Sequence, residues 1–104
     1  MEYKINGRQI TLFDNKYWIF SGELNNYNLE QLNEAIENIE NVFKGHYQAS
    51  SFFGDVVFTV EFDNEMSRIA YYDELVCEEP TIEIYNMLKD YRAKLIEYIE
   101  AKDI

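Results

Sequence analysis

The sequence predicts a single α+β domain, residues 1–104, with an antiparallel sheet of about five to six strands and two helices on one face of it. Three observations support this prediction. The chain has the length of one ordinary domain, and hydrophobic residues make up 47% of it, enough for a core of its own. Segments with alternating apolar residues occur in two groups. Each group precedes a segment with apolar residues at three- and four-residue spacing, which gives the order βββ-α-βββ-α.

The first group of strands lies before residue 22. Apolar residues alternate on both sides of Asn6-Gly7, and Asn-Gly is the strongest short-range signal for a β-hairpin, because both central residues of a type I′ turn need a positive φ. Residues 16–21 are rich in aromatic residues and predict a third strand.

The first helix has well-marked ends. Asn28 is the predicted N-cap, and Gln31 follows three residues later, as in a capping box. Gly45 suits the left-handed position that ends a helix, and His46 follows it. The apolar stripe between these ends consists of Leu29, Leu32, Ala35, Ile36, Ile39, Val42 and Phe43.

Three more strands are predicted over residues 47–53, 56–62 and 66–72, with a turn at residues 63–65. A long second helix follows, with Pro80 at its first position, where the missing N–H of proline is no loss. Its stripe consists of Ile84, Tyr85, Leu88, Tyr91, Leu95, Tyr98 and Ile99. Both stripes need an apolar surface to cover, which places both helices on one face of the sheet.

The net charge of −11 argues against several partners. Nucleic-acid binding depends on Lys and Arg to neutralise phosphates, and anionic membranes also attract basic residues, so we expect neither partner. The sequence shows no signal peptide and no apolar run of about 20 residues that would span a bilayer. Cys77 is the only cysteine, so we expect a reducing, cytoplasmic location.

The sequence offers no set of residues for catalysis. Cys77 precedes Glu78 and Glu79, and carboxylates raise a thiol pKa, while His46 is the only histidine. One Cys and one His cannot supply a zinc site, and residues 63–65 lack the ligand spacing of a calcium loop. The four glycines are isolated, which excludes a Gly-rich phosphate loop. We therefore predict a non-enzymatic protein with no catalytic residue, metal or cofactor.

The most distinctive segment, Asp55 to Glu83, holds nine acidic residues and one base, Arg68. Tyr71 and Tyr72 lie next to its acids, and adjacent strand residues are expected to point to opposite faces of a sheet. Acids steer a basic protein toward the surface, and tyrosine rings give contact area and cation–π acceptors. The predicted partner-binding residues are Glu61, Asp63, Glu65, Tyr71, Asp73, Glu74, Glu78 and Glu79.

In size, acidity and its Tyr-, Asp- and Glu-rich surface, the whole chain resembles the small immunity proteins of bacterial toxin systems. The resemblance is one of overall type and has no diagnostic motif. It implies an inhibitor that binds a basic toxin or nuclease. Two alternatives remain open: a structural or homo-oligomeric subunit, such as a homodimer, that uses Phe52, Phe53 and Trp18 for contact, and a regulatory domain with an aromatic pocket for a small molecule.

Overall fold

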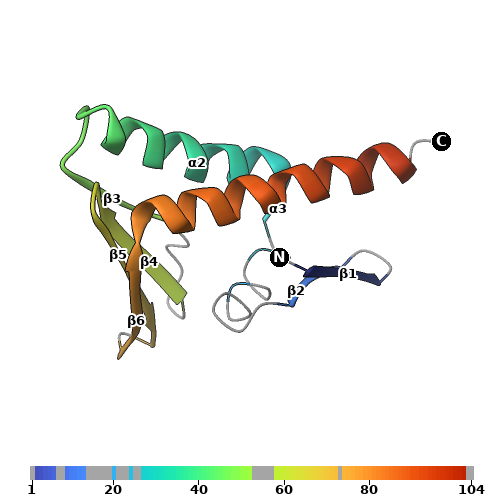
Figure 1. Cartoon of the computed structure of the whole chain (residues 1–104), viewed down its shortest axis with the longest axis horizontal. Coiled ribbons are helices and arrows are strands. Elements are labelled where there is room, and N and C mark those ends of the chain that lie inside the picture. The colour runs from blue at the N-terminus through green and yellow to red at the C-terminus, as the bar shows by residue number, and fades with distance from the viewer. Residues whose placement is uncertain are drawn as a thin grey trace.

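The computed structural model describes residues 2–6, 9–13, 20, 24, 27–52, 58–72 and 74–102. β1 (Glu2–Asn6) and β2 (Gln9–Phe13) form an antiparallel hairpin. The other strands form an antiparallel sheet in chain order: β3 (Ala49–Phe52), β4 (Phe58–Asp63), β5 (Met66–Tyr71) and β6 (Glu74–Pro80). The helices are α2 (Leu29–Phe43), before this sheet, and α3 (Thr81–Lys102), after it (Figure 1).

The predicted α+β class is confirmed, since the described residues include helices α2 and α3 and a four-stranded antiparallel sheet, but the predicted strand order is not matched. Strand β6, which carries much of the acidic segment, was not predicted. The third strand, residues 16–21, lies outside the described residues except for Phe20, which is buried in a helical turn. Asn6 pairs with Gln9, so it ends strand β1 instead of occupying the centre of the turn.

Both predicted ends of α2 are confirmed. Asn28 accepts a hydrogen bond from the Gln31 N–H at 2.8 Å, and the Gln31 side chain accepts one from the Asn28 N–H at 3.0 Å, which completes the capping box. At the other end Gly45 has a φ of 81°. The Gly45 N–H donates to Val42 O and the His46 N–H donates to Asn41 O, the bond pattern of a Schellman motif.

The two helices pack side by side and antiparallel. Tyr85 Oη on α3 donates to Glu40 Oε2 near the end of α2 at 2.7 Å, and Arg92 Nη1 donates to Asn33 Oδ1 near its start at 3.1 Å. The apolar stripe of α2 is buried between these contacts, with Leu29 and Phe43 less covered at its ends. In α3 the buried apolar residues lie in the first half: Ile84, Met87, Leu88 and Tyr91.

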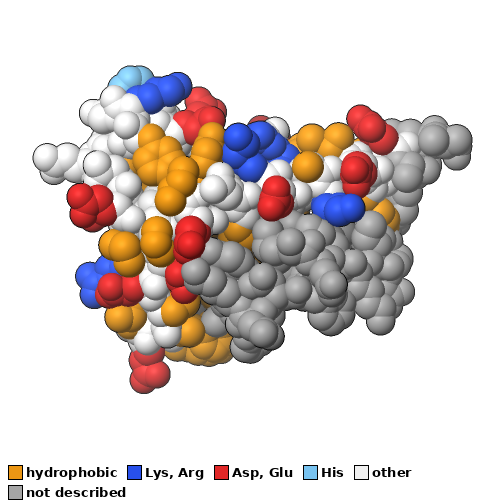
Figure 2. Space-filling model, in the orientation of Figure 1, with side chains coloured by type: hydrophobic (Ala, Val, Ile, Leu, Met, Phe, Trp, Pro, Cys, Tyr) orange, Lys and Arg blue, Asp and Glu red, His pale blue; other side chains and the backbone are white. Residues whose placement is uncertain are grey.

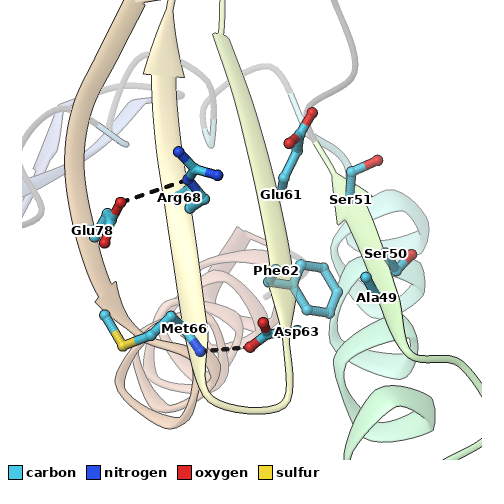
Figure 3. Close-up of a pocket in the computed structure, with 9 residues that line it drawn as sticks. All are labelled: Ala49, Ser50, Ser51, Glu61, Phe62, Asp63, Met66, Arg68 and Glu78. Atoms are coloured by element: carbon cyan, nitrogen blue, oxygen red, sulfur yellow. Dashed lines mark hydrogen bonds and ion pairs between the residues drawn. The ribbon is translucent and has the colours of Figure 1, made fainter.

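Alternation decides which face of the sheet the helices cover. In β4 the residues Phe58, Val60 and Phe62 are at most 3% exposed, while Thr59 and Glu61 point the other way. Ser67 and Ile69 of β5 are also buried on the helix side. Figure 3 views the sheet from its exposed side, and both helices lie behind the strands in that view. The core is therefore a two-layer contact between one face of the sheet and the two helices.

The start of α3 is tied to the β4–β5 turn by buried hydroxyl groups. Thr81 Oγ1 donates to Asp63 O at 2.8 Å, and Ser67 Oγ lies 2.9 Å from Thr81 Oγ1. Because the single hydroxyl proton of Thr81 goes to Asp63 O, Ser67 is the donor to Thr81. The prediction for Pro80 was wrong: this residue ends strand β6 and the helix begins at Thr81, whose N–H donates to Glu65 O.

Candidate binding face

The side of the sheet away from the helices, here called the outer face, is exposed. In β4 and β5 its residues are those that alternate with the buried ones, and Glu61 and Arg68 are a directly opposed pair on it. Arg68 is in turn opposite Glu78 of β6. The pairing register of the strands therefore brings acids from two separate parts of the acidic segment onto one surface.

A groove of about 580 Å³ lies on this outer face (Figure 3). It runs from β3 to β6 and is lined by Ala49, Ser50, Ser51, Glu61, Phe62, Asp63, Met66, Arg68 and Glu78. Three of these residues are acids and one is a base. A second hollow, of about 230 Å³, shares Glu61 and Arg68 with the groove and extends to Leu75. The two hollows adjoin at Glu61 and Arg68, so three acids and one base line one exposed surface.

The centre of this surface is partly neutralised by Arg68. Its Nε lies 3.6 Å from Glu78 Oε1, and the two side chains are 65% and 45% exposed. Solvent screens such a pair, so we expect it to contribute little to folding stability. Its effect is on the pattern of charge: a base lies between Glu61 on one side and Glu78 on the other. Both carboxylates remain accessible to a charged partner.

Asp63 has a structural role as well as a place in the groove. Its Oδ1 accepts hydrogen bonds from the Met66 and Glu65 N–H groups, both at 2.8 Å, and so closes the β4–β5 turn that the sequence predicted. These bonds, that from Met66 first, hold the pKa of the Asp63 carboxyl below its usual value of 3.8. Asp63 therefore stays ionised at neutral pH with one oxygen already used.

The predicted binding residues do not form one cluster. Glu61, Asp63 and Glu78 line the groove, and Glu65 is exposed in the turn beside it. Tyr71 and Glu74 pair with each other at the opposite end of the sheet. The remaining two differ: Glu79 pairs with buried Ser67, on the helix side and away from the groove, and Asp73 lies outside the described residues.

The expectation that Tyr71 and Tyr72 point to opposite faces was wrong. Tyr72 is not in a strand but in the turn between β5 and β6, with a φ of 52°. The turn brings the two rings together, with their centroids 4.8 Å apart and their planes at 88°. Both are exposed, Tyr72 more than Tyr71. The two tyrosines therefore act as one aromatic unit at the end of the sheet.

Several residues of the outer face were not predicted, because they have no chemical signature. Ser50, Ser51 and Met66 line the groove only because β3 and β5 flank β4. Leu75 and Val76 are about half exposed beside the tyrosines. Val76 is the extra residue of a β-bulge, since Ala70 is opposite Leu75 and Ile69 is opposite Cys77. A correct prediction of strand β6 would have been needed to find Leu75 and Val76.

The two alternative predictions gain little from these residues. Phe52, one of three proposed contact residues for a homodimer, is only 5% exposed, and its ring packs near that of Phe62. Phe53 and Trp18 lie outside the described residues. In the groove the only aromatic residue is Phe62, so the groove is not the aromatic pocket expected of a small-molecule site.

Cys77 packs partly buried against the core, and His46 is exposed at the end of α2 (pale blue in Figure 2). Within the described ranges, no three His, Cys, Asp or Glu side chains are grouped so that they could hold a metal ion. No helix in those ranges has the length and apolar character needed to cross a membrane. Comparison of the chain with protein-family models, curated proteins and solved structures finds no match.

Proposed function

We propose that this protein is a non-enzymatic binding module whose outer sheet face docks onto a basic protein. The observation that carries the proposal is the gathering of Glu61, Asp63 and Glu78 around one open groove of about 580 Å³. The groove lies on a strand-built surface; Glu61 projects from it, while Asp63 bonds back to the turn and Glu78 pairs with Arg68 (Figure 3). Rigid elements that present like charges on one face favour electrostatic steering of an oppositely charged partner.

The class of partner follows from the charge and from the shape of the surface. A groove lined by serines and acids, with one aromatic residue, suits a macromolecular surface better than an apolar ligand. The chain carries a net charge of −11, which repels nucleic acids and attracts Lys- and Arg-rich proteins. We propose an immunity-type inhibitor, acting in the cytoplasm, that covers the basic active surface of a toxin or nuclease.

Charge reversal on the outer face tests the proposal. The variant Glu61→Lys/Glu65→Lys/Glu78→Lys changes three exposed acids on and beside this face. Its matched control, Glu34→Lys/Glu37→Lys/Asp90→Lys, makes the same change of net charge at exposed positions of α2 and α3. Both variants and the original chain serve as bait in lysate of the source organism. The partner is then purified, and its association rate and enzymatic activity are measured.

We expect a basic protein that is retained by the original chain and by the helix control, and that is lost from the outer-face variant. Its association rate with the outer-face variant at low salt falls on the order of tenfold or more. Stoichiometric addition of the original chain inhibits its activity. Equal retention by both variants would contradict the assignment of the outer face.

Self-association is the second candidate, and strand β3 is the observation that favours it. This edge strand consists of Ala, Ser, Ser and Phe and carries no charge, whereas edge strand β6 carries three acids and a bulge. Charges and bulges prevent strand pairing between molecules. A dimer paired through β3 would have twice the 12.5 kDa mass in solution. Salt would strengthen it by screening like charges, whereas salt weakens binding to a basic partner.

A further inference from the structure

The β5–β6 turn combines exposure with an uncommon backbone conformation. Tyr72 is the one non-glycine residue with a positive φ in the described part of the chain, at 52°. A bulky residue in this left-handed region costs on the order of 1–3 kcal/mol, which glycine or asparagine would largely avoid. The ring does not recover this energy by burial, because Tyr72 is 62% exposed. Folding alone therefore does not explain a tyrosine here.

A series of ring contacts connects this exposed tyrosine to the core. Tyr72 packs edge to face on Tyr71, the Tyr71 centroid lies 6.5 Å from that of Phe58, and the Phe58 centroid lies 5.4 Å from that of Phe20. Phe58 and Phe20 are each 1% exposed. Contacts of this kind fix the position of a side chain before it binds. Tyr72 is thus a supported aromatic surface that loses little side-chain entropy on binding.

The surroundings of Tyr72 are apolar on one side and acidic on another. Leu75 and Val76 are 53% and 48% exposed, and Glu74, which pairs with Tyr71 across the turn, is exposed too. We call Tyr71, Tyr72, Glu74 and Leu75 the tip. Leu75 also lines the hollow that contains Glu61, so the tip adjoins the acidic outer face.

We propose that the tip is an anchor for an arginine side chain of the basic partner. The planar, weakly hydrated guanidinium stacks on the Tyr72 ring, and the carboxylate of Glu74, which lies on the same side of the sheet as Tyr71, pairs with its charge. Lysine, with its compact and strongly hydrated ammonium, gains less from the same surface. This inference rests on the proposed function and adds to it the residue that the partner must present.

The test uses two defined probes, nona-arginine and nona-lysine peptides, titrated into the full chain at one low salt concentration. Because the peptides carry equal charge, steering by the acidic face affects both alike. We expect the original chain to bind nona-arginine about two- to fivefold more tightly, the ratio that one exposed cation–π contact supplies. Amide resonances of Tyr72 and Glu74 shift more with nona-arginine than with nona-lysine.

Two variants remove the ring in different ways. Tyr72→Leu keeps an apolar side chain in the same backbone conformation, and Tyr72→Asn suits that conformation better. In both, the preference for nona-arginine disappears. The control is Tyr47→Leu, because Tyr47 is 54% exposed in the connection between α2 and β3, away from the tip; this variant keeps the preference.

Equal affinity of the original chain for the two peptides, or a preference that survives in both Tyr72 variants, would overturn the arginine anchor. The outer-face variant Glu61→Lys/Glu65→Lys/Glu78→Lys leaves the tip unchanged and so separates this result from a failure of the proposed function. If that variant lowers the affinity for both peptides while the Tyr72 variants change neither affinity, the acidic face is supported as the binding surface and the arginine anchor is contradicted. If it binds both peptides as the original chain does, the outer face is not the basic-partner site and both proposals fall.

Discussion

The two ends of the four-stranded sheet are built in opposite ways. At the β4–β5 end, Asp63 closes the turn with its carboxylate, and Thr81 and Ser67 tie that turn to helix α3 through buried hydroxyls. At the β5–β6 end, Tyr72 adopts a left-handed conformation and its ring lies in solvent. One end uses its polar groups for folding, whereas the other carries strain and exposed aromatic surface. The difference shows that one turn of the sheet serves folding, whereas the other presents aromatic surface to solvent.

The largest effect is expected at the first end. Thr81→Val keeps the shape of the side chain but removes the hydroxyl, so Asp63 O loses a donor and the Ser67 hydroxyl loses an acceptor in a buried place. We expect the free energy of unfolding to fall by about 1–3 kcal/mol, measured by urea denaturation. The control Thr59→Val lies half-exposed on the outer face and should change stability by less than about 0.5 kcal/mol. Equal losses in the two variants would show that the buried hydroxyls have no special role.

The second prediction has the opposite sign and concerns the tip. Tyr72→Asn removes the cost of a bulky residue at positive φ and also loses the ring contact with Tyr71. Since the first effect is the larger, we expect the unfolding free energy to rise by roughly 0.5 kcal/mol. Tyr47→Asn, at an exposed residue without positive φ, should bring no gain. A clear loss of stability in Tyr72→Asn would mean that the ring supports the fold, which would weaken the contrast between the two ends.

The third and smallest effect is a change with pH at the β4–β5 end. The pKa of Asp63 is lower in the folded chain than its usual 3.8, because the Met66 and Glu65 N–H groups bond the carboxylate. Because its pKa is lowered by folding, Asp63 stabilises the fold at pH values above its pKa in the unfolded chain. This contribution is lost as the pH falls through its pKa in the folded chain. Asp63→Asn cannot titrate, so we expect its stability to fall less than that of the original chain between about pH 5 and about pH 3. Parallel pH profiles of urea unfolding would contradict this role.

Much of the fold was predictable where the signal is local. The capping box of Asn28 and Gln31 and the left-handed Gly45 are set by residues within a few positions of each other, and all were correctly placed. The alternation of Phe58, Val60 and Phe62 correctly gave the buried face of β4. These predictions succeeded because backbone hydrogen bonding and side-chain direction repeat over short distances.

Strand β6 was missed because its residues do not look like a strand. Glu74, Glu78 and Glu79 interrupt any alternation, a bulge at Val76 shifts its register, and Pro80 resembles a helix start. The segment is a strand because β5 offers it an edge with unpaired backbone groups. The same omission explains the wrong placement of Tyr72, which was assigned to a strand and lies in a turn.

The sequence by itself determined the α+β class, the ends of α2, most of the buried stripe of α2 and the acidic character of residues 55–83, because each depends on composition or on neighbours along the chain. Only the tertiary structure decided which acids share a surface. Glu61 and Glu78 are seventeen positions apart and meet across Arg68, whereas Glu79, one residue further, points to the other side of the sheet. Strand pairing fixes such neighbours through contacts between distant segments, and a shift of one residue reverses the face that each side chain occupies.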